Sequence, residues 1–237
     1  MKIIKMISII LTILESTMNK ELYNNGFVVV KNVYSEEQIS NMRQSSLAFF
    51  SEGGGFKNAG GHAKPDWIKE DSLSELLHEY NMDKMQTLVS EYVGEEVFFI
   101  GHNDLHLNRS VGWHRDQLNG EARKFQIHSP WDTVEDQEMK IYKVNLYLQD
   151  HSNNNDALVV RKGSHKFESL QRGIVEQIRL GLGDLIIFDQ RLSHKATWSG
   201  GYDRLLICMG FGVKNIFFDE FQAGTNFRQN QQNNKNR

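Results

Sequence analysis

The stretch Gly183-Asp-Leu-Ile-Ile-Phe-Asp-Gln-Arg-Leu-Ser-His194 decides how the rest of the chain is interpreted. A glycine turn leads into a short apolar run of β-favouring residues. His194 follows just past the end of that run. The pattern predicts a buried strand that delivers a histidine at its end.

Similar short runs continue on both sides of this stretch. Candidate strands cover 97–101, 103–109, 141–149, 157–161, 175–180, 185–189 and 204–212. No helical periodicity of any length interrupts them. The N-terminal part differs, because a β-branched strand at 26–33 is followed by capping-box and helical patterns. The helical segments are 35–50, the stretch from Ser72 through Leu77, and 82–93, which Gly94 ends. Helices first and strands afterwards favour an α+β fold with an all-β core.

Two glycine-rich or polar segments interrupt these elements. Glycines make 53–67 a flexible loop, and 117–140 is a long polar excursion of the kind that forms lids or binding loops. The tail 228–237 is polar throughout and is expected to be disordered. One domain over 21–227 accounts for the remainder, since no repeat or second domain is evident.

The charge and cysteine content of the chain argue against a nucleic-acid partner and against internal disulfides. The 237 residues carry a net charge of −3, which gives no basic surface for nucleic acid. The single cysteine, Cys208, allows no internal disulfide. We therefore expect a small-molecule substrate and no nucleic acid. The sequence indicates no oligomeric state.

The segment 1–20 has two interpretations. Lys2 and Lys5 precede an apolar run, Met6–Leu14, which is too short to span a bilayer and lacks a small-residue cleavage site. We interpret it as a docked N-terminal helix, or as an overextended start with Met18 as the initiator, in a cytoplasmic protein. The alternative is a targeting or membrane-associated segment.

A metal site is suggested by Trp113-His-Arg-Asp116, in which a histidine and an aspartate stand two residues apart. Positions i and i+2 of a strand share a face, so His114 and Asp116 can converge on one ion. His194 is the best third ligand. Two imidazoles and one carboxylate on one face of an octahedron leave three positions open, which is the arrangement of iron(II) oxygenases. The His-x-Asp pair alone is a weak signal, because chance pairs are frequent among nine histidines.

Arg204 strengthens the interpretation. It lies at the start of the strand expected at 204–212, and an antiparallel neighbour would place it beside the His194 end. A guanidinium binds a carboxylate through paired hydrogen bonds, as the distal carboxylate of 2-oxoglutarate requires. The alternative is a surface arginine paired with Asp203.

The ordered motifs resemble the phytanoyl-CoA dioxygenase family of iron(II)- and 2-oxoglutarate-dependent oxygenases over roughly residues 21–213. The likeness runs through Gly26-Phe-Val-Val-Val-Lys-Asn-Val33, Trp113-His-Arg-Asp116, Asn145-Leu-Tyr-Leu-Gln-Asp150, Ala157-Leu-Val-Val-Arg-Lys-Gly-Ser-His165, and Gly183 to His194. The chain departs from the family at Asp156, where glycine is usual, and at Lys162, where proline is usual.

The resemblance implies a double-stranded β-helix, a jelly-roll core with helices packed outside. It implies that His114, Asp116 and His194 bind iron(II), that Arg204 anchors the C5 carboxylate of 2-oxoglutarate, and that Asn145 touches the co-substrate. Related halogenases carry a small residue in place of the aspartate, so Asp116 favours hydroxylation or another oxidation with O₂. Gly163-Ser-His165 is read as a structural turn.

Three alternatives stay open at this point. The same metal site can carry out desaturation or cyclisation. A cupin-like protein can hold a metal without turnover, although such a protein needs no arginine anchor. A zinc hydrolase would need a general base beside the metal. Substrate contacts are expected from the loops 53–67 and 117–140, with Trp67, Arg115 and Trp131 as candidates.

Overall fold

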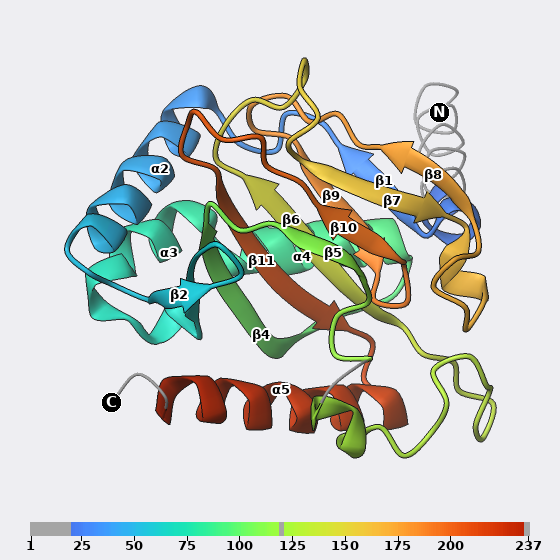
Figure 1. Cartoon of the computed structure of the whole chain (residues 1–237). Coiled ribbons are helices and arrows are strands. Elements are labelled where there is room, and N and C mark those ends of the chain that lie inside the picture. Colours follow the sequence, from blue (N-terminus) through green and yellow to red (C-terminus); the bar gives the residue numbers. More distant parts are fainter. Residues whose placement is uncertain (1–19, 119–120, 235–237) are drawn as a thin grey trace, which may run out of the picture.

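The computed structural model describes residues 20–118 and 121–234, and their strands form two antiparallel sheets (Figure 1). The expectations for residues 1–19 lie outside the described residues. The larger sheet has seven strands, in the order β1 (Phe27–Val30), β9 (Leu185–Asp189), β6 (Ile141–Tyr147), β11 (Leu205–Gly212), β4 (Phe98–Leu107), β3 (Gly61–Pro65) and β2 (Phe56–Asn58). The smaller sheet has four, in the order β5 (Val111–His114), β10 (His194–Ala196), β7 (Leu158–Lys162) and β8 (Ile174–Gln177).

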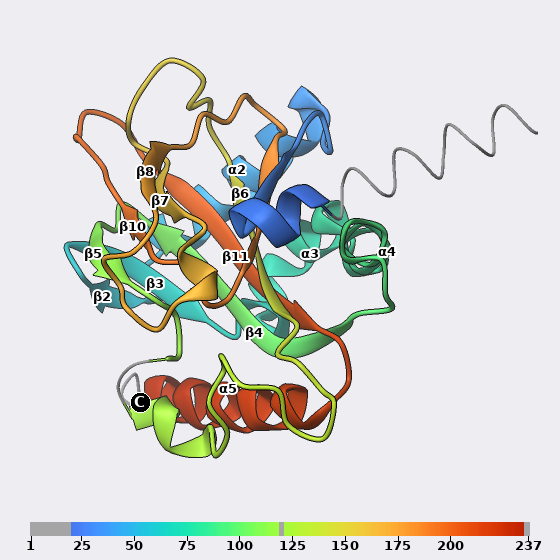
Figure 2. The ribbon, with the colours of Figure 1, turned by 90° about the vertical axis from the view of Figure 1, so that its right-hand side faces the viewer.

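Helices cover one face of the larger sheet. These are α2 (Glu36–Ser51), α3 (Ser74–Tyr80) and α4 (Met82–Val93), and Figure 2 shows α3 and α4 on the side opposite the smaller sheet. Alternate strand residues such as Val144, Leu146 and Ile187 pack beneath the helices in the main hydrophobic core. The helices α2 and α4 confirm the expected segments, with a capping box at Ser35 and a left-handed Gly94 at the end of α4.

The other face of the larger sheet packs on the smaller sheet. Tyr147, Ile186 and Leu206 from the larger sheet meet Leu158 and Val160 from the smaller one. The arrangement is α+β, as expected, with all strand pairs antiparallel. The two sheets enclose the space into which the inward-facing side chains of β4, β6 and β11 project.

Several strand boundaries differ from the sequence expectation. The glycine-rich segment 53–67 contains β2 and β3, which pair with each other and extend the sheet edge. A side chain at Gly61 would come within 2.1 Å of the Leu107 carbonyl oxygen, so close approach of β3 to β4 requires glycine there. The two strands expected at 97–101 and 103–109 are the single strand β4, in which Gly101 adopts a φ of 86°.

Two further local features differ from what the sequence predicts. The short strands β5 and β10 were not predicted, because runs of four and three residues are too short to show an alternating pattern. No capping box forms at Ser72: α3 begins at Ser74, and the Ser72 hydroxyl donates to Glu70.

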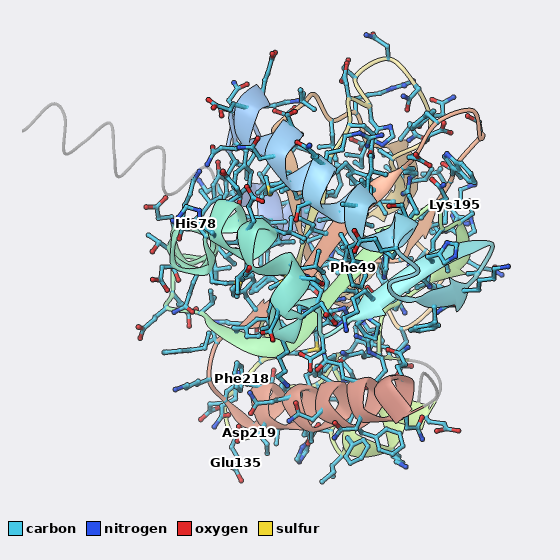
Figure 3. The ribbon with its side chains drawn as sticks, turned by 90° about the vertical axis from the view of Figure 1, so that its left-hand side faces the viewer. Phe49, His78, Glu135, Lys195, Phe218 and Asp219 are labelled. Atoms are coloured by element: carbon cyan, nitrogen blue, oxygen red, sulfur yellow. The ribbon has the colours of Figure 1, made fainter. Side chains whose placement is uncertain are left out.

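The polar tail is the main correction to the domain boundaries. Helix α5 spans Ile216–Asn234 and runs beneath the larger sheet, with Phe218 near its start (Figure 3). Its first turns bury Phe217 and Phe221 against β4 and β6. Arg228 then forms a two-pronged ion pair with Asp104, at 2.8 Å for both contacts. Residues 228–234 are helical rather than disordered, and Arg228, Gln229 and Gln231 have hydrogen-bond partners inside the fold. None of the helices in 20–118 and 121–234 combines the length and apolarity needed to cross a bilayer.

Deleting 228–237 tests this helix. The truncation leaves the buried Asp104 carboxylate without Arg228, and breaking a buried ion pair costs about 3–5 kcal/mol. We expect urea denaturation to show a loss of that size in the free energy of unfolding. Deleting only 235–237 is the control and leaves stability unchanged. Equal stability of the two truncated chains would contradict the role of α5.

Candidate metal centre

Two strands of the smaller sheet bring the two histidines together. His114, the last residue of β5, lies directly opposite His194, the first residue of β10. Their ring centroids are 4.3 Å apart. Asp116 lies beyond the end of β5, so it does not share a regular strand with His114 as expected. One ligand atom from each of the three residues nevertheless falls within 4.8 Å of the others.

The imidazoles are oriented for metal binding. His114 Nδ1 lies 2.7 Å from the Gly112 carbonyl oxygen, and His194 Nδ1 lies 2.9 Å from that of Leu192. Each Nδ1–H therefore donates to its carbonyl, which leaves Nε2 as the free lone pair. Both Nε2 atoms face Asp116, at 3.3 Å from Oδ1 for His114 and 3.8 Å from Oδ2 for His194. A backbone acceptor that fixes the tautomer of a ligand histidine is characteristic of metal sites.

The protonation states of the three residues follow from burial and charge. Burial lowers the pKa of His194 to about 4, so its imidazole is neutral near pH 7. Burial opposes ionisation of Asp116, but the Lys143 charge and the His114 hydrogen bond outweigh it and hold the pKa well below the usual range. For His114, burial is outweighed by the Asp116 contacts, which raise the pKa. Asp116 and His194 are thus ready to bind a cation, while His114 must release any proton it holds.

The three residues line a cavity of about 200 Å³ between the sheets. Its polar lining comes largely from alternate positions of β4 and β6, whose side chains point inward. Its apolar lining includes Val111, Leu158, Ala196 and Leu206. The further polar lining residues are His102, Asp104, His106, Arg109, Gln117, Lys143, Asn145 and Arg228.

Lys143 is a member of the site that the sequence did not indicate. Its side chain is fully buried, and Nζ lies 3.1 Å from Asp116 Oδ2 and 2.7 Å from His102 Nε2. The ammonium neutralises the Asp116 carboxylate. A lysine in an otherwise ordinary strand carries no sequence signal, because its inward direction depends on the register of β6 with β9 and β11.

Arg204 is buried, with 1% of its surface exposed. Four hydrogen bonds hold its guanidinium: to the carbonyl oxygens of Asp156, Arg109 and Ala157, and to the Tyr147 hydroxyl. All four acceptors are neutral. Within the described residues no carboxylate lies within 4.0 Å of it, so the alternative of a surface pair with Asp203 does not hold. A buried cation without an anion is costly, and it fits a ligand carboxylate.

Asn145 and Tyr147 share the inward face of β6, and the Tyr147 ring contacts Arg204. Asn145 lines the cavity, and its buried Oδ1 has no hydrogen-bond partner among the described residues. The Tyr147 hydroxyl lies 3.3 Å from Arg204 Nη2. Sequence reasoning missed Tyr147, although its spacing of two from Asn145 on a strand places both on one face.

A second polar group lines the cavity from β4 and α5. Asp104 accepts from Arg228 and lies 3.2 Å from His102 Nε2. Arg109 Nη1 lies 2.7 Å from His106 Nε2. Burial, reinforced by neighbouring positive charges, lowers the pKa values of His102 and His106 to about 4, which keeps both imidazoles neutral. The i, i+2, i+4 spacing of His102, Asp104 and His106 is a signal that would have found this face.

The loop residues expected to contact substrate lie elsewhere. Trp67 is fully buried in the main hydrophobic core. Arg115 stacks on Trp131 and donates to backbone carbonyls of the segment 164–169. None of the three lines the cavity. The turn at Gly163 is structural as predicted, since His165 Nε2 bonds to the Tyr23 carbonyl oxygen.

No protein-family model matches the chain, and no curated protein matches its sequence. Solved structures do match its fold. AviO1 from Streptomyces viridochromogenes Tue57 has a TM-score of 0.66 and 16% identity, over 84% of this chain and 95% of that one. The non-haem α-ketoglutarate-dependent epimerase SnoN, from nogalamycin biosynthesis, has a TM-score of 0.63 and 14% identity over 84% and 83%. EctD from S. alaskensis, solved with 2-oxoglutarate and 5-hydroxyectoine, has a TM-score of 0.63 and 13% identity, over 83% of this chain and 75% of that one. The chain therefore shares the fold of these proteins.

Replacing Lys143 tests its relation to the metal. In Lys143→Met, Asp116 loses its neutralising partner and the metal loses a repelling charge. We expect divalent metal to bind at least about tenfold more tightly, a change of about 1.4 kcal/mol. The metal-free protein should become less stable. Metal titration measures the first effect and denaturation the second, with the exposed Lys57→Met as the control. Weaker metal binding in Lys143→Met would contradict a repulsion between Lys143 and the metal.

The neutral histidines predict how stability depends on pH. Since burial lowers the pKa of His102 from 6.5 to about 4, the unfolded chain takes up the proton first as the pH falls. Stability is therefore full above pH 6.5 and is lost toward pH 4, by at most about 3 kcal/mol for this group. In His102→Gln the free energy of unfolding should change less between pH 7 and pH 4. His78→Gln, on α3 (Figure 3), is the control. If the free energy of unfolding of His102→Gln changed with pH as steeply as that of the wild type, His102 would not contribute to the pH dependence.

Proposed function

We propose that this protein is an iron(II)- and 2-oxoglutarate-dependent dioxygenase that hydroxylates an unactivated C–H bond of a small metabolite, with release of succinate and CO₂. The observation that carries the proposal is the cluster of His114, Asp116 and His194 inside the cavity, with both Nε2 atoms turned toward Asp116. Two imidazoles and a carboxylate from one side suit iron(II) and leave positions for other ligands.

The co-substrate assignment rests on Arg204. Its buried guanidinium has five N–H groups, four of them already bonded to neutral acceptors. The C5 carboxylate of 2-oxoglutarate would supply the missing negative charge, with the Tyr147 hydroxyl as a second donor. Asn145 would contact the co-substrate nearer the metal, since it lines the cavity and its buried Oδ1 has no partner among the described residues.

In this proposal the side chains bind the metal, orient the co-substrate and exclude water. Bound iron(II), 2-oxoglutarate and O₂ supply the oxidising chemistry. His114, Asp116 and His194 hold the metal from one side, and the Gly112 and Leu192 carbonyls fix the two rings. Arg204 orients the co-substrate. Leu158 and Leu206 form the apolar wall that keeps water from the reacting C–H bond.

The family and the finer fold class belong to the same proposal. The motif series and the two facing antiparallel sheets support a double-stranded β-helix and a divergent member of the phytanoyl-CoA dioxygenase family. SnoN and EctD, which share the fold, are an α-ketoglutarate-dependent epimerase and a protein solved with 2-oxoglutarate. Both support the co-substrate.

Among the alternatives, a different outcome at the same site has the most support, because SnoN is an epimerase. Epimerisation, desaturation and cyclisation share the metal and the co-substrate. A zinc hydrolase has less support. Of the lining side chains that could serve as its general base, Asp104 is held by Arg228, and the His102 and His106 rings are held by Lys143 and Arg109. A cupin-like metal binder would leave Arg204 without a function.

Anaerobic titration of the iron(II) protein with 2-oxoglutarate tests the assignment, because the iron–co-substrate complex has a charge-transfer absorption band. The wild type should develop the band, and His194→Ala should lose both iron binding and the band. Arg204→Lys keeps a cation but loses the hydrogen bonds that hold the guanidinium in place, so 2-oxoglutarate affinity should fall at least about tenfold. Its iron affinity should match that of the control Arg172→Gln. A wild type that binds iron(II) but never 2-oxoglutarate would sink the proposal.

A further inference from the structure

The charges that line the cavity do not balance. Arg109, Lys143 and Arg228 are cations, while Asp104 and Asp116 are the lining carboxylates, which leaves one excess positive charge. The lining histidines on β4 are neutral near pH 7. A divalent metal and the dianion 2-oxoglutarate would cancel each other, so the excess on these lining residues persists in the loaded site, and the buried Arg204, which is not a lining residue, adds a further positive charge.

Arg109 is the cation without a partner. Asp104 holds Arg228 through two hydrogen bonds, and Asp116 holds Lys143. For Arg109, no carboxylate of 20–118 or 121–234 lies within 4.0 Å. Its guanidinium is hydrogen-bonded only to the neutral His106 ring, and its buried Nε lacks any partner in the described part of the chain. Burial lowers its pKa by more than the charges of Asp104 and Asp116, which do not contact it, raise it.

The fold aims Arg109 into the cavity. It lies in the short loop between β4 and β5, where Asn108 has a left-handed φ of 57°. Arg204 braces this loop from both sides: its Nη1 donates to the Arg109 carbonyl oxygen, and its backbone N–H donates to Asn108 Oδ1. The loop leads directly into β5, which ends at His114. An anion on Arg109 is therefore held in the same cavity as the metal ligands.

The other lining groups narrow the class of ligand. Both lining carboxylates are engaged, so a substrate amine would find no free negative charge among the lining residues. Val111, Leu158, Ala196 and Leu206 offer apolar surface to the rest of the molecule. The cavity of about 200 Å³ is smaller than the usual range of about 300–1,000 Å³ for ligand pockets.

We infer that the substrate is a small aliphatic carboxylic acid, bound as its anion by Arg109. The inference rests on the proposed function and names the substrate class of that site. Arg109 would hold the carboxylate while the apolar lining directs a C–H bond of the hydrocarbon part toward the metal. A hydrogen bond to a charged group contributes about 1.5–3 kcal/mol. That range corresponds to a preference of roughly 10- to 100-fold for the acid over its uncharged amide.

Nuclear magnetic resonance of the arginine Nε–H groups tests this without turnover. Zinc(II) replaces iron because it is redox-inert and diamagnetic, and 2-oxoglutarate is added to saturation. The probes are acetate, propionate and 2-methylpropanoate, each against its primary amide. The acids should shift the Arg109 signal, which is assigned from its absence in Arg109→Gln, and the amides should bind at least about tenfold more weakly. Arg172→Gln, an exposed arginine on the loop after β7, should keep the acid preference, and Arg109→Gln should lose it.

Four outcomes overturn the inference. In the first, no acid shifts the Arg109 signal below a dissociation constant of about 10 mM, the scale of a weak single ion contact. In the second, acids and amides bind equally. In the third, inorganic phosphate binds more tightly than acetate, which would contradict a site for a carboxylate. In the fourth, Arg109→Gln lowers 2-oxoglutarate affinity at least about tenfold, which would make Arg109 a co-substrate residue. Failure of the proposed function is separate, because then 2-oxoglutarate itself does not bind the metal-loaded wild type.

Discussion

The antiparallel pairing of β5 with β10 is the constraint on which the site depends. Its register sets His114 opposite His194, and the chain then turns so that Asp116 faces both rings. A shift of one residue would turn one histidine to the other face of the sheet. The pairing is short, so its register is stabilised from outside. β10 also pairs with β7, and the Ser193 N–H donates to the Ser164 hydroxyl.

The second organising feature is the placement of charge in a buried, polar cavity. Buried charges are costly unless they are paired, and most of those in the cavity are paired within the fold. The exceptions are informative. Arg109 in the cavity has only a neutral imidazole, and Arg204, which is buried but is not a lining residue, has only neutral acceptors. We assign each of these two guanidiniums an anionic ligand: Arg204 the co-substrate, and Arg109 the substrate that we infer. They are linked, since Arg204 braces the loop that carries Arg109.

The sequence predicted the parts of this arrangement that depend on local patterns. The α+β order, the helices α2 and α4, the strand β9 and the three clustered residues were all readable from periodicity, capping and spacing. It did not predict Lys143 or Arg109, because their directions depend on strand register and on a loop fixed by a distant arginine. The polar tail was misread for a similar reason. Arg228 and Gln229 have partners on β4, and their composition alone resembles that of disordered segments.

The central claim is that the cavity couples iron(II) to 2-oxoglutarate. The most direct measurement is succinate formation from 2-oxoglutarate by the purified iron(II) protein under air, compared with the same protein under anaerobic conditions and with Asp116→Ala. We expect succinate only from the wild type in air, in amounts that rise when a small carboxylic acid of the right shape is added. Wild-type protein that holds iron(II) yet forms no more succinate in air than Asp116→Ala, with every acid tried, would contradict it.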